Sequence, residues 1–104
     1  MTDAEELEIY KKYKESVPRQ KQIIQEMEED LQEAKAILID IDQELKDGNI
    51  TQEEYRSIQE SMQEIIDEVT ANKPEQEKIL KRCQEFISLY EERQKQESDQ
   101  SLKN

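Results

Sequence analysis

The chain has 104 residues, 40% of them charged, with one glycine, two prolines and one cysteine, and its formal net charge is −12. This length leaves room for a single domain, and the shortage of glycine and proline beside abundant Glu, Gln, Lys, Leu and Ile favours long helices over sheets. The negative charge argues against direct binding of nucleic acid, and no apolar run in the sequence reaches the roughly 18 residues that a membrane-spanning helix needs.

The first part of the sequence predicts a short amphipathic helix. Its apolar stripe consists of Leu7, Tyr10, Tyr13 and Val17. Because proline fits a helix only in its first turn, we predict that an additional N-terminal helix over residues 1–17 ends before Pro18. The alternative is one helix that continues through a kink at Pro18, since Tyr10, Val17 and Ile24 keep the same phase at seven-residue steps.

Residues 19–46 predict the first helix of a bundle. Its apolar residues are Ile24, Met27, Leu31, Ala34, Leu38, Ile41 and Leu45. The alternating spacing of three and four residues is that of a coiled-coil seam. Ile23 and Ile37 widen this seam on one side. A stripe that wide usually contacts two neighbouring helices, which favours a bundle over a two-stranded coiled coil.

The turn that follows is specified by local signals. Gly48 can take the left-handed conformation that closes a helix. Thr51 and Glu54 form a capping box, and Ile50 with Tyr55 occupies the two positions of a hydrophobic staple. The stretch Asp-Gly-Asn-Ile-Thr-Gln-Glu-Glu-Tyr resembles the turn of short helical-hairpin domains. That resemblance implies a hairpin at this point and carries no function.

Two more helices are predicted after the turn, over residues 51–72 and 74–97. Their seam residues are Tyr55, Ile58, Met62, Ile65 and Val69, followed by Leu80, Cys83, Ile87 and Tyr90. The break between the two helices rests on Pro74, which fits only the first turn of a new helix. Residues 98–104 have Leu102 as their one apolar residue and are predicted to be a disordered tail.

Together these elements predict an all-α protein. Its fold is an antiparallel, coiled-coil-like three-helix bundle over residues 18–97, preceded by the short additional N-terminal helix over residues 1–17. Cys83 is in register with the seam of the last helix, which favours a small core residue over a reactive or metal-binding thiol.

The net charge is concentrated in the predicted hairpin. Between Gln22 and Asn72 there are three basic and fifteen acidic residues, a balance of −12, and the flanking segments are neutral. We therefore expect a persistent negative surface. This surface keeps the protein soluble, and it also suits a protein partner with a basic surface.

The chemistry of the sequence argues against catalysis. The chain has no histidine, one cysteine and no glycine-rich phosphate loop, and its carboxylates lie mostly off the apolar seam. We predict no enzymatic activity, no metal site and no cofactor.

The sequence therefore predicts a cytoplasmic protein-protein interaction module, such as an adaptor, assembly factor or chaperone-like subunit, that does not insert into membranes. The nucleus is an alternative location. We expect a partner helix to dock either on the N-terminal apolar stripe or in a groove between helices of the bundle. The candidate partner-binding residues are Leu7, Tyr10, Tyr13 and Val17. Aromatic residues outside a main core are common interface anchors. The alternative for this stripe is packing onto the chain's own helices. Two other functions stay open: a structural homo-oligomer of helical bundles, and an acidic inhibitor that mimics nucleic acid.

Overall fold

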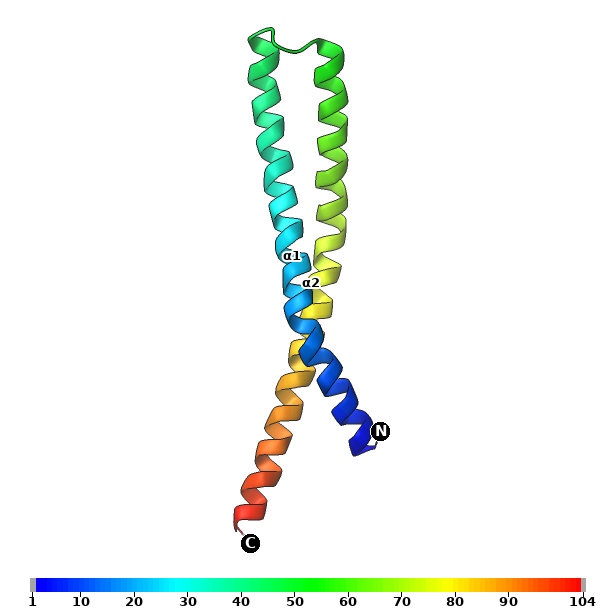
Figure 1. Ribbon diagram of the computed structural model, residues 1–104, viewed down its shortest axis with the longest axis vertical. Helices are drawn as coiled ribbons and strands as arrows, with labels where there is room; N and C mark the ends of the chain where they lie inside the picture. Colours follow the sequence, from blue (N-terminus) through cyan, green and yellow to red (C-terminus); the bar gives the residue numbers. More distant parts are fainter. Residues whose placement is uncertain (1, 104) are drawn as a thin grey trace. The chain divides into compact units, whose positions relative to one another are not determined.

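The computed structural model describes the backbone of residues 2–103 and the side chains of residues 2–97. It contains two helices, α1 (Asp3–Lys46) and α2 (Gln52–Lys103), joined by a short turn (Figure 1). No strand occurs among the described residues. The predicted all-α class is confirmed.

The prediction of a three-helix bundle is not confirmed, because the chain folds into two long helices. Helix α1 runs through Pro18, so the predicted N-terminal helix over residues 1–17 is the first part of α1. Helix α2 runs through Pro74, so the predicted helices over 51–72 and 74–97 are one helix. The continuous alternative considered for Pro18 describes α1 correctly.

The continuity of the seam explains why neither proline ends its helix. A proline within a helix costs about 3 kcal/mol. The seam of α2 nevertheless keeps one phase across Pro74, with Val69, Gln76 and Cys83 at seven-residue steps. If the helix ended at Pro74, the residues before and after the proline would no longer share one apolar face. Pro18 and Pro74 are both exposed.

The chain forms two compact units. We call residues 23–75 the hairpin unit, and residues 1–22 with 76–104 the terminal unit. Each unit contains one stretch of α1 and one stretch of α2.

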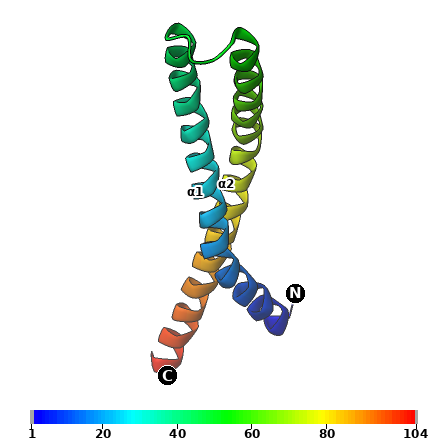
Figure 2. The same cartoon turned by 45° about the horizontal axis from the view of Figure 1, so that its top comes forward.

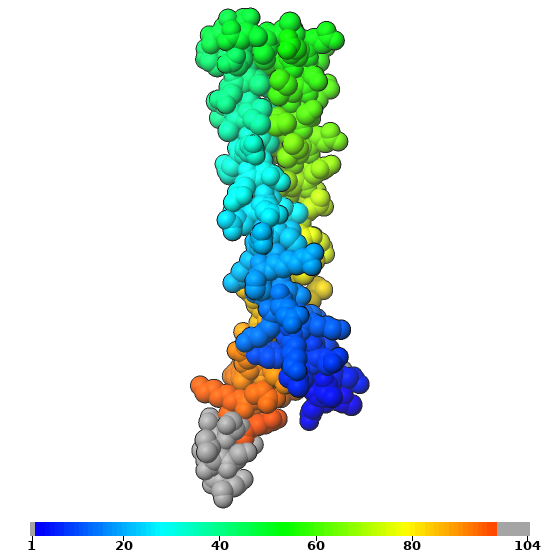
Figure 3. Space-filling view, viewed as in Figure 1, coloured from blue at the N-terminus to red at the C-terminus, as the bar shows by residue number. Residues whose placement is uncertain are grey.

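In the hairpin unit, α1 and α2 run antiparallel on either side of the turn (Figure 2). Ala34, Ile41 and Val69 are its buried side chains, and the other seam residues are half-buried. Side chains of the two helices also pair at the surface, where Lys73 forms a salt bridge with Glu28. The space-filling view shows the two helices of this unit in contact over its length (Figure 3).

The turn has the geometry that its sequence predicts. Gly48 has a φ of 74°, and its N–H donates to the carbonyl of Leu45 at 3.1 Å. The N–H of Asn49 donates to the carbonyl of Glu44 at 2.9 Å, which completes a Schellman closure of α1. The N–H of Glu54 donates to Thr51 Oγ1 at 3.1 Å, and the N–H of Thr51 donates to Glu54 Oε1 at 3.2 Å. The predicted capping box is therefore confirmed.

In the terminal unit, a polar pair occupies the seam between the two helices. Gln20 Nε2 donates to the side-chain Oε1 of Gln76 at 2.7 Å and to its backbone carbonyl at 3.0 Å. Cys83 is buried in the same unit, in agreement with its prediction as a core residue. The backbone is helical to Lys103, which includes most of the predicted disordered tail over 98–104; the side chains of that tail lie outside the described residues.

Candidate interaction surfaces

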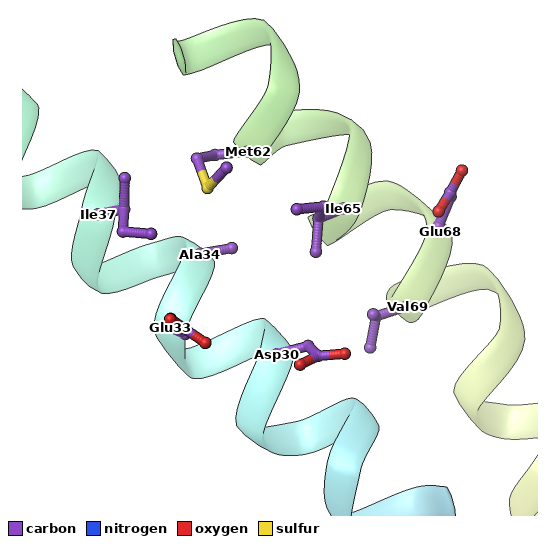
Figure 4. Close-up of a pocket in the computed structure, with 8 residues that line it drawn as sticks. All are labelled: Asp30, Glu33, Ala34, Ile37, Met62, Ile65, Glu68 and Val69. Atoms are coloured by element: carbon purple, nitrogen blue, oxygen red, sulfur yellow. The ribbon is translucent and has the colours of Figure 1, made fainter.

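The hairpin unit contains an open groove between α1 and α2, with a volume of about 410 Å³. Its apolar lining consists of Ala34, Ile37, Met62, Ile65 and Val69. Figure 4 shows Met62, Ile65 and Val69 pointing from α2 toward α1, with Ala34 facing them. Met62, Ile65 and Ile37 are only half-buried. The two helices of the hairpin therefore leave part of their shared apolar stripe open to solvent.

The rest of the groove lining is acidic. Asp30 and Glu33 on α1 and Glu68 on α2 complete the lining; Figure 4 shows Asp30 extending toward α2 and Glu68 pointing away from α1. The lining contains no lysine or arginine. This local imbalance matches the whole unit, because residues 23–75 hold sixteen acidic and four basic residues, a balance of −12. The terminal unit is neutral, with eleven residues of each sign.

The four residues predicted to bind a partner lie in the terminal unit, where two of them contact aromatic residues of α2. The Tyr10 ring stacks on Tyr90 with centroids 4.3 Å apart. The Tyr13 ring meets Phe86 edge-on at 5.2 Å, with an interplanar angle of 84°. These contacts correspond to the alternative in which the stripe packs onto the chain's own helices. Binding of a partner by these side chains stays a prediction.

The remaining two predicted residues are Leu7 and Val17. Leu7 is 39% exposed. Val17 is half-buried and lines a shallow depression with Pro18 and Ile87. The sequence thus identified a real apolar stripe, but its aromatic members are occupied by contacts within the terminal unit.

A polar cluster surrounds the outer edge of Tyr10. The Tyr10 hydroxyl donates to Glu91 Oε1 at 2.7 Å, and Lys14 Nζ lies 3.1 Å from the same oxygen. Lys14 Nζ is also 5.4 Å from the centroid of the Tyr10 ring. One turn away, Arg93 forms a salt bridge with Glu6 at 3.0 Å. These charged pairs join α1 to α2 beside the aromatic contacts.

The cluster shifts the acidity of two of its members. The hydrogen bond from Tyr10, followed by that from Lys14, lowers the pKa of the Glu91 carboxyl below its usual value. Hydrogen bonds to Tyr10 and Glu91 raise the pKa of the Lys14 ammonium. Both shifts favour the charged forms, so the Lys14–Glu91 pair is ionised at neutral pH.

Similar pairs occur in the hairpin unit. The hydrogen bond from Lys73 lowers the pKa of Glu28. The Tyr55 hydroxyl donates to Asp42 Oδ1 at 2.6 Å, and this bond raises the pKa of the Tyr55 hydroxyl. Each pair joins α1 to α2 on the surface and lies outside the groove lining.

Two large apolar side chains are strongly exposed among the described residues. Ile39 on α1 is 72% exposed and Leu89 on α2 is 67% exposed. Leu89 lies in a shallow depression with Lys81, Glu85 and Ser88. Ile39 lies in the hairpin unit but does not line its groove.

Sequence reasoning offered a groove between bundle helices as one of two docking places, but it named no residues for that groove. It assigned Ile37, Met62 and Ile65 to the inside of a bundle, where a third helix would cover them. The signal was present in the width of the stripe over residues 19–46, which predicts two neighbours for that helix. The hairpin unit supplies only one, so the second row of apolar residues is left half-exposed.

Neither helix of the described chain has an apolar stretch long enough to cross a membrane. Within the same residues, no group of three or more cysteine, aspartate or glutamate side chains is arranged to hold a metal ion. Comparison with models of protein families, with curated proteins and with solved structures gave no match to this chain.

Proposed function

We propose that this protein is a non-enzymatic interaction module that binds a helix of another protein in the groove of the hairpin unit. The observation that carries the proposal is the half-exposed apolar lining contributed by both helices, with Ile37 on one side and Met62 and Ile65 on the other. Helix-in-groove recognition uses such a surface, because a partner helix adds the missing neighbour and buries its own apolar side chains at the same time. An adaptor, assembly or chaperone-like role follows from this mode of binding.

The groove is a better docking surface than the stripe predicted from the sequence. Tyr10 and Tyr13 already contact aromatic rings of α2, and a partner would have to displace them. Of the four predicted residues, Leu7 is the most accessible. We therefore assign the predicted stripe a supporting role in binding at most.

A display experiment with two matched variants tests the proposal. A library of helical peptides with varied flanking charge is selected against the wild-type chain, and the selected peptides are then tested on Ile37→Gln and Ile39→Gln. Both variants replace one isoleucine of the same helix, but only Ile37 lines the groove. We expect binding to wild type and Ile39→Gln, and at least tenfold weaker binding to Ile37→Gln, because a buried anchor commonly contributes more than 1.4 kcal/mol.

Two results would contradict this function. One is the failure of the selection to enrich any helical peptide. The other is equal binding of the selected peptides to Ile37→Gln and to wild type. Circular dichroism of both variants is the control for folding: with helix content equal to that of wild type, a loss of binding is due to the change in the groove.

A structural homo-oligomer is the second candidate function. It is supported by Leu89, which is 67% exposed in a unit of balanced charge, where two copies do not repel each other. Sedimentation over a concentration series tests it, with Leu89→Gln as the variant and Ile39→Gln as the control. We expect an oligomer that Leu89→Gln dissociates, and a strictly monomeric wild type eliminates this candidate.

A further inference from the structure

We propose that the helix bound in the groove is basic and amphipathic, with apolar residues every third or fourth position and lysine or arginine on both flanks. This inference rests on the proposed function of the groove, and it specifies the chemistry of the partner. It follows from the shape of the apolar lining and from the charges beside it.

The apolar lining determines the spacing of the apolar residues on the partner helix. On α1 the groove extends from Asp30 to Ile37, which is about 10 Å at 1.5 Å per residue. A helix that follows this length presents two turns to the groove. Its anchors therefore fall at positions i, i+3 or i+4, and i+7. The volume of about 410 Å³ and its open form suit several aliphatic side chains on one face of a helix.

The acidic residues of the lining determine which charge the partner helix carries beside its apolar face. Asp30 and Glu33 lie on α1 and Glu68 lies on α2, so both helices contribute carboxylates to the groove lining. No cation in the lining neutralises them. The four basic residues of the hairpin unit are Lys35, Lys46, Arg56 and Lys73. None of the four lines the groove, so lysine or arginine on the partner supplies the missing charge.

The same charges argue against a second copy of this chain as the occupant. Each hairpin unit has a balance of −12. Two copies joined groove to groove would bring two sets of Asp30, Glu33 and Glu68 together, and like charges across an interface weaken association. A basic helix turns this repulsion into attraction. It also raises the rate of association at low salt, when the charges act over a longer range.

Three synthetic peptides and two variants test the inference. The peptides are fluorescein-labelled helices of about 18 residues, five turns, with one shared leucine face and with lysine, glutamine or glutamate on the flanks. The first variant, Asp30→Asn/Glu33→Gln/Glu68→Gln, removes the three carboxylates beside the groove. The control, Glu29→Gln/Glu53→Gln/Glu60→Gln, removes three exposed carboxylates that do not line it. Both variants have the same net charge, so they differ only in where the charge is lost.

Fluorescence anisotropy gives the affinities. We expect the lysine peptide to bind the wild-type chain about tenfold more tightly than the glutamine peptide, and the glutamate peptide to bind most weakly. The groove variant loses most of that tenfold preference, and the control variant keeps most of it. Raising the salt to about 1 M, where the screening length falls to about 3 Å, brings the lysine and glutamine peptides close together.

The possible failures are distinguishable. If the lysine and glutamine peptides bind equally well, the inference about the partner is overturned and the groove function stands. If both variants lose the preference for the lysine peptide equally, that preference depends on the net charge of the chain and not on the three carboxylates of the groove. This result also overturns the inference. If no peptide binds, the proposed function itself fails. If sedimentation shows that the chain self-associates and Ile37→Gln dissociates it, a second copy occupies the groove and the inference is wrong.

Discussion

Replacing Tyr13 tests whether the aromatic stripe of α1 is part of the fold. Tyr13→Ala removes the edge-to-face contact with Phe86, whose centroid lies 5.2 Å away. Such a pair contributes about 0.5–1.5 kcal/mol beyond the area it buries. Replacing a fully buried aromatic side chain with alanine lowers the free energy of unfolding by about 3–5 kcal/mol in total. Tyr13 is only half-buried, so its replacement costs less. We therefore expect Tyr13→Ala to lower the free energy of unfolding by about 2 kcal/mol.

The assay is a double-mutant cycle measured by urea unfolding with circular dichroism. Tyr13→Ala, Phe86→Ala and the double variant give a coupling energy that isolates the ring contact, even though Phe86 also has Tyr90 as a neighbour at 6.4 Å. We expect a coupling of about 1 kcal/mol. Leu7→Ala is the control, because Leu7 is 39% exposed and should change stability by about 0.5 kcal/mol or less.

Hydrogen exchange locates the effect. The lost stability should appear as faster exchange of backbone amides in the terminal unit, since the contact lies within that unit. A coupling below about 0.3 kcal/mol, with unchanged exchange in Tyr13→Ala, would refute the structural role of the pair. The stripe would then be free for the partner binding that the sequence predicts.

Three further predictions follow from single features of the structure. Gly48→Ala should lower the free energy of unfolding by about 1–2 kcal/mol in urea, because φ is 74° at this position and an added Cβ would have no atom within 4 Å to clash with. Gly48→Asn should cost less, since asparagine tolerates the left-handed conformation better. Equal effects of the two substitutions would contradict this explanation from the backbone. Gln20→Leu should lower the urea midpoint, because it leaves Gln76 without its hydrogen bond from Gln20. Leucine at both positions should raise the urea midpoint above that of wild type. A double variant with a lower urea midpoint than the single variant would contradict this prediction. Because the pKa of Glu91 is lowered, the stability that this carboxylate contributes is present above the usual carboxyl pKa of about 4.5 and is lost as the pH falls through the lower pKa of the folded state. Tyr10→Phe removes the hydrogen bond that is the largest cause of the shift, so the pKa of Glu91 should rise. A carbon-detected NMR titration of this variant in which the Glu91 pKa does not rise would rule out that cause.

The turn could be predicted from the sequence because its stabilising contacts are local. The hydrogen bonds of Thr51 with Glu54 and the left-handed conformation of Gly48 involve residues within a few positions of each other. Capping chemistry is decided at that range. The seam of residues 24–45 was predicted for a related reason, since its three-and-four spacing reports one helix face directly.

The two prolines show where local rules fail. A proline is a break signal because of its own missing N–H and its ring. Whether the helix ends there depends on packing along the rest of α1 or α2, and the sequence rule does not include that packing. Between Val69 and Leu80 the seam positions are Lys73 and Gln76, which look like a gap in the apolar pattern. In the structure Lys73 pairs with Glu28 and Gln76 pairs with Gln20, so polar contacts continue the seam.

The groove could be predicted only in part. The width of the stripe on α1, to which Ile23 and Ile37 contribute, predicted a second neighbour for that helix. The error was to supply that neighbour from the same chain. Once α2 is continuous, no third helix exists in the described chain to cover Ile37 and Ile65. The pairing of Gln20 with Gln76 was beyond prediction, because it depends on the register between two segments far apart in the sequence.

The placement of charge beside the groove is unfavourable for the isolated hairpin. Asp30 and Glu33 are three residues apart on one helix, and like charges at that spacing destabilise a helix by a few tenths of a kcal/mol. A lysine at either position would relieve the repulsion and leave the apolar lining unchanged. Carboxylates away from the groove do have cationic or hydroxyl neighbours, as Glu28 has Lys73 and Asp42 has Tyr55. The hairpin therefore gains nothing in its own stability from acids beside an open apolar surface, whereas a basic helix in the groove would satisfy both features at once.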